Sequence, residues 1–232
     1  SGASFGAALA LLLGFGFTGV QLTAFCFGIA AVALTCLMGK GGSRASMILS
    51  GIMMGSLFSA LVSLVKFTAD TESQLPAITY WLMGSLSAAG FAALKLGAPA
   101  ILVSCAVLLL VRWKLNLLPL SDDEARTFGT NMKRLRGLCI VCCAAMTASC
   151  VAMCGQVGWV GLLVPHVCRM IFGSSHARLL PACISCGAVF MMVVDTLART
   201  ISAAEIPVSI LTAIIGAPIF ITIVRKKGGW SL

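Results

Sequence analysis

Apolar runs separated by short polar segments make up most of the chain. Seven of them approach or reach the length of about 20 residues that crosses a bilayer: 20–38, 45–66, 95–111, 137–154, 157–172, 179–198 and 207–224. An eighth run, from Ala3 to Phe17, covers only 15 residues. No segment alternates apolar and polar residues as a strand does, and lipid cannot satisfy open backbone groups, so helices are expected. The pattern predicts an all-α, polytopic transmembrane helical bundle with about eight membrane crossings, in a single domain over residues 1–232.

Composition narrows the class of protein. Hydrophobic residues make up 59% of the chain and charged residues 10%, whereas soluble domains have about 45–50% and about 25%. A chain with so little polar surface needs a lipid bilayer around it. The formal net charge of +9 would suggest nucleic acid in a soluble protein. Here the basic residues lie between apolar runs, without a basic stripe of interleaved aromatics, so we expect no nucleic-acid partner.

The basic residues also predict the orientation of the chain. Cytoplasmic loops of membrane proteins carry an excess of lysine and arginine. If the carboxyl terminus is cytoplasmic, helix alternation places 13 of the 16 basic residues on that side and only Lys66, Lys95 and Arg199 outside. The loop 112–136 is the largest contributor to this bias. We therefore expect a multi-pass protein whose loop 112–136 and carboxyl terminus lie in the cytoplasm.

Eleven cysteines lie almost entirely within the apolar runs. Cys139 and Cys142 have the CxxC spacing, as do Cys183 and Cys186, which could indicate a metal or redox site. No second cluster of polar ligands accompanies either pair, and buried cysteine commonly acts as a small apolar residue. We therefore favour packing and expect no metal site.

Two outer segments are too short to span a membrane. They are 78–90, and 202–207, which ends at Pro207. Short, interrupted helices beside membrane crossings often line a translocation path. Aromatic residues such as Tyr80 and Trp81 also anchor a chain at the membrane surface. The sequence leaves both interpretations open.

Small residues recur at four-residue spacing in the 45–66 run. Gly51, Gly55 and Ser59 share one helix face, which Ser63 continues. Such a face lets two helices approach closely. It could equally form a smooth wall along a pore, although packing is the commoner reason.

The cytoplasmic loop contains a pattern typical of a short helix. Ser121 precedes Asp122, Asp123 and Glu124, and a serine cap followed by acidic residues stabilises a helix N-terminus. Glu124 stands three residues after Ser121, which completes a capping box. Gly129 stands where a helix of about two turns would end. The segment is either a docking helix for a soluble partner or a well-capped connecting loop.

The 157–172 run contains Pro165, His166 and Arg169. Proline leaves a backbone carbonyl unpaired and kinks a helix. Arg169 is expected at the cytoplasmic end, where its side chain reaches the lipid headgroups. His166 could in principle relay protons or bind a metal, but no carboxylate lies in this run, so we favour a role in structure and coupling.

Asp195 and Arg199 are spaced to form an ion pair between adjacent turns of the 179–198 helix, near its outer end.

Six stretches of the chain resemble, in order, the permease subunits of ABC importers for ferric siderophores, haem and cobalamin, the FecCD family. These stretches are 1–13, 49–67, 80–90, 115–129, 158–181 and 195–226. Family members have ten transmembrane helices, so eight crossings imply that the first two, and the entry to the third, are missing here. The family usually has an aspartate before the histidine of the loop after the Pro-His helix, whereas this chain has Ser175 before His176.

The resemblance implies a transport subunit of the bacterial plasma (inner) membrane, with no catalytic residue and no bound cofactor. A second permease copy or a paralogue would complete the path. Two cytoplasmic ATPase subunits would use ATP and Mg, and an extracytoplasmic binding protein would deliver the substrate.

The resemblance also assigns roles to particular residues. It implies a translocation path lined by Gly51, Gly55, Ser59, Trp81, Gly84, Pro207 and Gly216. Within the coupling loop 113–136, it implies ATPase contacts from Ser121, Asp122, Asp123, Glu124, Ala125 and Gly129. It places Arg199, oriented by Asp195, against the binding protein, and Pro165, His166 and Arg169 in a signature kink near the cytoplasmic surface.

Iron–siderophore complexes are the first expected substrate, with haem or cobalamin as alternatives. Two further alternatives remain from other classes. An ion-coupled secondary transporter would need carboxylates near the middle of the membrane, and none of the seven acidic residues falls in the middle of a run. The other alternative is a truncated remnant that does not transport.

Overall fold

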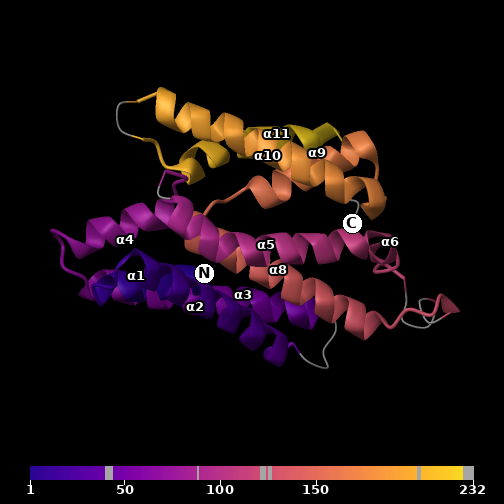
Figure 1. Ribbon diagram of the computed structural model, residues 1–232, viewed down its shortest axis with the longest axis horizontal. Helices are drawn as coiled ribbons and strands as arrows, with labels where there is room; N and C mark the ends of the chain where they lie inside the picture. Colours follow the sequence, from indigo (N-terminus) through magenta and orange to yellow (C-terminus); the bar gives the residue numbers. More distant parts are fainter. Residues whose placement is uncertain (40–43, 88, 121–123, 125–126, 203–204, 227–232) are drawn as a thin grey trace. The chain divides into compact units, whose positions relative to one another are not determined.

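The computed structural model describes residues 1–39, 44–87, 89–120, 124, 127–202 and 205–226. Regular secondary structure in these ranges is helical, which confirms the predicted all-α fold (Figure 1). The helices are α1 Gly2–Leu12, α2 Phe17–Met38, α3 Arg44–Thr68, α4 Gln74–Met83, α5 Phe91–Leu110, α6 Arg112–Leu115, α8 Met132–Cys154, α9 Val160–Phe172, α10 His176–Thr200 and α11 Val208–Lys226.

Five of these helices are long and apolar enough to cross a membrane by themselves: α2, α3, α5, α8 and α10. Three further apolar helices, α1, α9 and α11, have shorter apolar stretches. The eight predicted apolar runs therefore correspond, in order, to these eight of the ten helices. The count of eight crossings stays a prediction, because the apolar parts of α1, α9 and α11 are shorter than the other five helices.

The chain forms two compact units. The first comprises Ser1–Cys105 and Ile140–Gln156, and the second comprises Ala106–Cys139 and Val157–Leu232. Helices α5 and α8 each contribute to both units. The single domain predicted over residues 1–232 stays a prediction.

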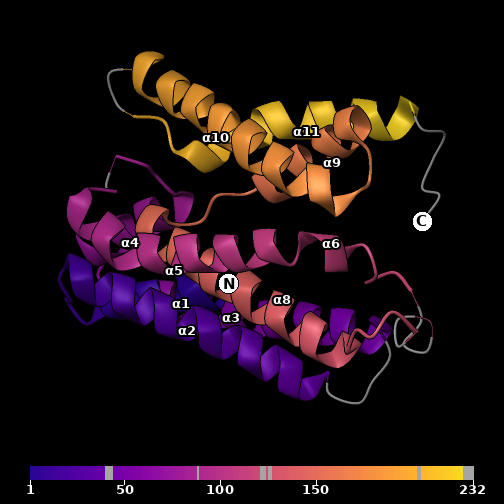
Figure 2. The same ribbon diagram turned by 45° about the vertical axis from the view of Figure 1, so that its right-hand side comes forward.

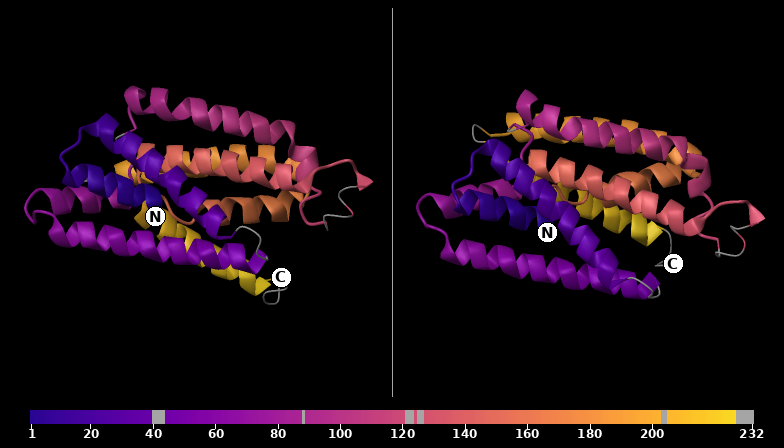
Figure 3. Two further views of the ribbon diagram at one scale, coloured as in Figure 1. Left: turned by 90° about the horizontal axis from the view of Figure 1, so that it is seen from below. Right: turned by 60° about the horizontal axis from the view of Figure 1, so that its bottom comes forward.

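Helix α1 is the centre of the first unit. Its residues Ala3, Ala7 and Ala10 pack against Val20 and Ala24 of α2. On another side of α1, its Ala8 packs with Val65, Ala69 and Ile78, which belong to α3, α4 and their connection. Figures 1 and 3 show α1, α2 and α3 side by side. The small residues of α1 allow this close approach on several sides.

The second unit is built around α10. Figures 1 and 2 show α9, α10 and α11 as neighbours. Val164 and Cys168 of α9 are buried with Leu179 of α10, and Cys183 and Cys186 pack against this cluster. All eleven cysteines are free thiols. Cys183 and Cys186 thus contribute to the packing of α10 against α9.

The helix boundaries differ from the predicted ones at the cytoplasmic loop. Helix α8 begins at Met132, not at residue 137, and α6 forms a further short helix inside the loop. The Asn131 side chain accepts a hydrogen bond from the Arg134 amide at 3.1 Å and so caps α8. The hydropathy pattern missed this turn because its basic residues are polar, although lysine and arginine are good helix formers.

Helix α4 also begins earlier than the predicted short segment 78–90. It starts at Gln74, and Pro76 lies in its first turn, where a missing backbone N–H costs little. Asp70 organises the approach to α4, because its carboxylate accepts hydrogen bonds from the Ser73 hydroxyl at 2.6 Å and amide at 2.8 Å. The hydroxyl bond, followed by the amide bond, lowers the pKa of Asp70.

Candidate functional site

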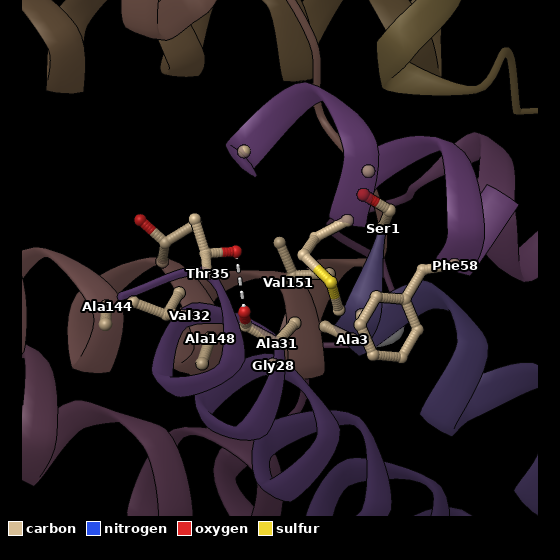
Figure 4. Close-up of a pocket in the computed structure, with 15 residues that line it drawn as sticks. Ser1, Ala3, Gly28, Ala31, Val32, Thr35, Phe58, Ala144, Ala148 and Val151 are labelled. Atoms are coloured by element: carbon tan, nitrogen blue, oxygen red, sulfur yellow. Dashed lines mark hydrogen bonds between the residues drawn. The ribbon is translucent and has the colours of Figure 1, made fainter. Parts of the chain in front are cut away.

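A cavity of about 210 Å³ lies within the first unit, between α1, α2, α3 and α8 (Figure 4). Gly51, Gly55 and Phe58 line it from α3, and Thr35 lines it from α2. The Thr35 hydroxyl donates a hydrogen bond to the Ala31 carbonyl at 2.8 Å, the dashed line in Figure 4. The cavity wall is therefore made mainly of small or apolar groups, with a hydroxyl satisfied by its own helix.

The space around Gly51 and Gly55 bears on the two interpretations of the small-residue face. A methyl group added at Gly51 would lie 3.8 Å from the Thr35 side chain, and one at Gly55 would lie 3.7 Å from the Ser1 hydroxyl. Both distances are ordinary contacts. At Gly6 of α1, by contrast, the added carbon would lie 2.5 Å from the Thr23 carbonyl oxygen. Close helix packing thus requires Gly6, whereas the surroundings of Gly51 and Gly55 leave room for a methyl group.

Ser59 continues this face away from the cavity. It is exposed, and its carbonyl accepts a hydrogen bond from the Ser63 hydroxyl at 3.1 Å. The face is therefore smooth over several turns of α3. Gly51, Gly55 and Ser59 thus present small side groups along one face of α3, and Met54 and Phe58 of the same helix also line the cavity.

Gly84 lies at a backbone crossing between the end of α4 and the end of α8. Its φ is +71°, and an added side-chain carbon would lie 2.6 Å from the Gln156 carbonyl oxygen. Gly155, which directly follows α8, has φ +71° and faces Gly84. The Ser85 amide donates a hydrogen bond to the Cys154 carbonyl at 2.9 Å, which joins the two chain segments. Only glycine fits at both positions. Gly84 was among the residues predicted to line the path, whereas Gly155 was not predicted from the sequence.

Trp81 and Tyr80 occupy different environments. Trp81 packs against the α1–α2 cluster, whereas Tyr80 is 53% exposed. Tyr80 thus fits the interpretation of a surface anchor, and Trp81 helps to hold α4 in place. Both residues are in the first unit.

Gly216 and the signature residues belong to the second unit. A side-chain carbon at Gly216 of α11 would lie 3.0 Å from the Trp159 side chain. Trp159 has the unusual φ of +66° and its ring lies edge-on to that of Phe220, 6.4 Å away. The His166 ring also lies edge-on to Phe220, at 5.9 Å. Gly216 therefore makes room for an aromatic cluster that holds α9 against α11.

The other predicted residues of this region lie nearby in the chain. Pro165 is inside α9, and Arg169 is exposed in its last turn. Pro207 immediately precedes α11, and its carbonyl accepts a hydrogen bond from the Ile210 amide at 3.1 Å. The Ile206 amide donates to the Ala198 carbonyl at 3.1 Å, which ties the entry of α11 to α10.

Parts of the predicted coupling helix can be compared with the structure. Ser121, Asp122, Asp123 and Ala125 lie outside the described residues. Thr127 donates its hydroxyl to the Glu124 carbonyl at 2.6 Å, as within a helical turn. Gly129 has φ +68°, the left-handed conformation with which many helices end. These features agree with a short helix that ends at Gly129.

The base of this loop holds a contact that the sequence analysis missed. Asn116 follows α6, and its side-chain oxygen lies 2.8 Å from the His176 amide nitrogen and 2.9 Å from His176 Nδ1. Both residues lie in stretches that resemble the FecCD family, 115–129 and 158–181. No local sequence pattern indicates that they meet. Their separation of 60 residues hides the contact from any local pattern.

Asp195 and Arg199 form the predicted ion pair. The Arg199 Nε donates to Asp195 Oδ2 at 2.9 Å, with the Arg199 side chain 45% exposed and that of Asp195 27% exposed. A pair this exposed contributes little to stability, on the order of 0.2–1 kcal/mol. It does orient the guanidinium, which leaves further N–H groups for a partner.

Gln21 of α2 is a further residue that was not predicted from the sequence. Its side chain is 2% exposed, and neither amide atom has a hydrogen-bond partner among the described residues. It lines a cavity of about 130 Å³ in the first unit, together with Ser149 of α8. A lone glutamine inside an apolar run was the available signal.

Known proteins match this chain over nearly its whole length. The MolB permease of the molybdate import system of Haemophilus influenzae is 42% identical over 99% of this chain and 69% of its own length. The Fe(3+)-citrate import permease YfmE of Bacillus subtilis is 37% identical over 94% of this chain and 67% of its own length.

A solved structure matches the fold. It shows an inward-facing conformation of an ABC transporter assigned to the metal-chelate type, with 43% sequence identity and a TM-score of 0.93 over 97% of this chain and 73% of that chain. The FecCD transport family matches residues 1–226. With its helical fold and its long apolar helices, the chain belongs to the FecCD family of ABC transporter permeases.

Proposed function

We propose that this chain is the membrane-spanning permease subunit of an ATP-driven importer for iron–siderophore complexes. The observation that carries the proposal is the match to the FecCD family over residues 1–226. In this proposal the chain performs no bond chemistry. Two cytoplasmic ATPase subunits supply the energy, a second permease copy completes the path, and an extracytoplasmic binding protein delivers the substrate.

The cavity beside α3 supports a path along that helix. An added side-chain carbon at Gly51 or Gly55 would meet only a side-chain atom at ordinary contact distance and not a neighbouring backbone, and Ser59 extends the same face. A wall of small side groups can pass a bulky ligand without binding it tightly. The short helix α4 and the entry to α11 at Pro207 are proposed to complete the path, as in the interrupted helices of other transporters.

The two surfaces of the protein are proposed to have different partners. The helix that ends at Gly129 contacts the ATPase, and Arg199 contacts the binding protein. The excess of basic residues in loop 112–136 supports a cytoplasmic position for that loop and for the carboxyl terminus. Binding at either face would then bias one equilibrium between inward- and outward-facing states.

Molybdate is a second candidate substrate, favoured by the 42% identity to a molybdate permease. Molybdate is an oxygen-rich anion, and the small residues Gly51, Gly55 and Ser59 carry no charge that would select between it and a ferric chelate. In this proposal the binding protein selects the substrate, because it binds the ligand before the permease does.

Uptake by the reconstituted transporter tests the proposal. The full-length permease, its ATPase and its binding protein would be placed in proteoliposomes loaded with ATP. We expect ATP-dependent accumulation of an ⁵⁵Fe-labelled siderophore complex that stops when the ATPase is inactive. Accumulation of ⁹⁹Mo-molybdate alone would assign the second candidate. Uptake that follows an ion gradient without ATP would contradict the proposed class of transporter.

A further inference from the structure

Asn116 and His176 form a bond between the coupling loop and the start of α10. The Asn116 side chain reaches the His176 backbone nitrogen at 2.8 Å and Nδ1 of its ring at 2.9 Å. A backbone N–H can only donate, so the amide atom that faces both nitrogens is Oδ1. It follows that Nδ1 carries a proton and donates to the same oxygen. One oxygen thus holds both the backbone and the side chain of His176.

The first turn of α10 depends on this outside support. Helix starts leave backbone N–H groups unpaired, and the residue before the helix often caps them. The side chain of Ser175, in that position, makes no cap hydrogen bond. Pro181 lies inside α10 and has no N–H to offer the carbonyl of Ala177. Asn116, 60 residues away in the sequence, therefore replaces a cap that the helix does not supply.

Apolar packing surrounds the same contact. Leu115, next to Asn116, is buried with Met132 and Leu135 of α8, and Leu180 of α10 packs against this group. Both ends of the coupling loop therefore meet at the first turns of α10. The hydrogen bonds add specificity to this packing, because they fix which residue of α10 lies beside the loop.

Helix α10 connects this junction to the opposite end of the unit. It contains 25 residues, so at about 1.5 Å per residue it extends roughly 37 Å. The Asp195–Arg199 pair lies in its last turns. Along its first half, α10 buries Leu179 with Val164 and Cys168 of α9. A displacement of the first turn of α10 would therefore be carried along one continuous helix.

We propose that the Asn116–His176 contact is a latch through which the coupling loop and α10 move as one body during transport. This inference rests on the proposed function, since it assumes that an ATPase moves the loop. Asn116 and His176 are positioning residues in this scheme, because they touch neither ATP nor substrate. Without the latch, the loop would move while α10 stays behind.

Three variants of the full-length transporter separate the latch from a general role in folding. Asn116→Leu removes the acceptor with little change in size, and Asn116→Asp keeps an acceptor oxygen. Asn131→Leu is the matched control, because Asn131 caps α8 in the same loop through the Arg134 amide and forms no hydrogen bond to α10 within the part of the chain that the structure describes. In proteoliposomes, we expect Asn116→Leu to retain ATP turnover while substrate moved per ATP falls about five- to tenfold, the lower range of coupling between linked sites. Asn116→Asp should restore that ratio, and Asn131→Leu should leave it within about twofold of the parent.

A distance measurement decides the latch independently of transport. Spin labels would be placed at Lys114 and Arg178, both exposed, in a cysteine-free background. We expect one narrow distance distribution in the nucleotide-free and ATP-trapped states of the parent complex, and a shifted or broadened one in Asn116→Leu. If the parent complex transports nothing, the proposed function fails, but the distances still test the latch. Equal distance distributions in the parent and Asn116→Leu, or equal losses of coupling in Asn116→Leu and Asn131→Leu, would overturn it.

Discussion

At the scale of single residues, the glycines divide into those that the backbone requires and those whose surroundings leave room for a side-chain carbon. Gly84 combines φ +71° with a carbonyl oxygen 2.6 Å from any added side-chain carbon. Gly51 has neither constraint, and its added carbon would make an ordinary contact at 3.8 Å. The four-residue spacing in the sequence could not separate these cases, because it records where small residues lie and not what faces them.

This difference predicts that alanine at the two positions changes the stability of the protein to different extents. Gly84→Ala should destabilise the full-length protein by at least about 1–3 kcal/mol, the usual cost of an unfavourable backbone conformation, because the added carbon also meets the Gln156 carbonyl. Gly51→Ala should be nearly neutral. Thermal unfolding in one detergent measures both variants against the parent. Equal unfolding midpoints for Gly84→Ala and the parent would show that the two segments separate at little cost.

At the scale of elements, the end of the coupling helix permits a similar comparison. Gly129 has φ +68° and no atom near an added side-chain carbon. Gly129→Val should therefore strain only the local backbone and unwind the helix end that we propose to dock in the ATPase. We expect ATP turnover to persist while uptake falls several-fold, as for a lost coupling interaction. Combining it with Glu124→Lys, which reverses a charge in the same helix, should deepen the loss of uptake.

Gly137→Val is the matched control for this prediction. Gly137 lies in α8, its surroundings are equally open, and its φ is not in the left-handed region. It therefore receives the same side chain without the same strain. Uptake at the parental rate in both Gly129→Val and the double variant would show that the segment is only a linker.

Much of the element structure follows from hydropathy alone. The apolar runs gave the order of the helices, because apolar residues that cross lipid must be helical. The starts of α4 and α8 could not be predicted in this way. Each first turn is polar or contains proline, and its helical conformation depends on Asp70 or Asn131. The pairing of Asn116 with His176, and of Gly84 with Gly155, required the fold itself, since neither contact is local in the sequence.

At the scale of the whole molecule, the distribution of charge predicts an orientation in the membrane. Glu72 and Phe128 are exposed on loops that the basic residues assign to opposite sides. In a cysteine-free, full-length permease in right-side-out vesicles, Glu72→Cys should react with an impermeant thiol reagent. Phe128→Cys should react only after the membrane is opened. Reaction of both before opening would overturn the predicted topology.

The outer surface provides the last test, because Arg199 departs from the charge distribution of the rest of the chain. It is one of only three basic residues assigned to the outside, and Asp195 holds its guanidinium at 2.9 Å. A carboxylate on the binding protein could accept the remaining N–H groups, and a charge-assisted bond contributes about 1.5–3 kcal/mol when it is largely desolvated. Arg199→Glu should therefore weaken binding to the full-length transporter in nanodiscs by about tenfold or more at low salt. A lysine in place of the partner carboxylate should restore the affinity. Unchanged affinity at low salt would leave Arg199 with the local ion pair alone, because an exposed contact with a charged partner is strongest where screening is weakest.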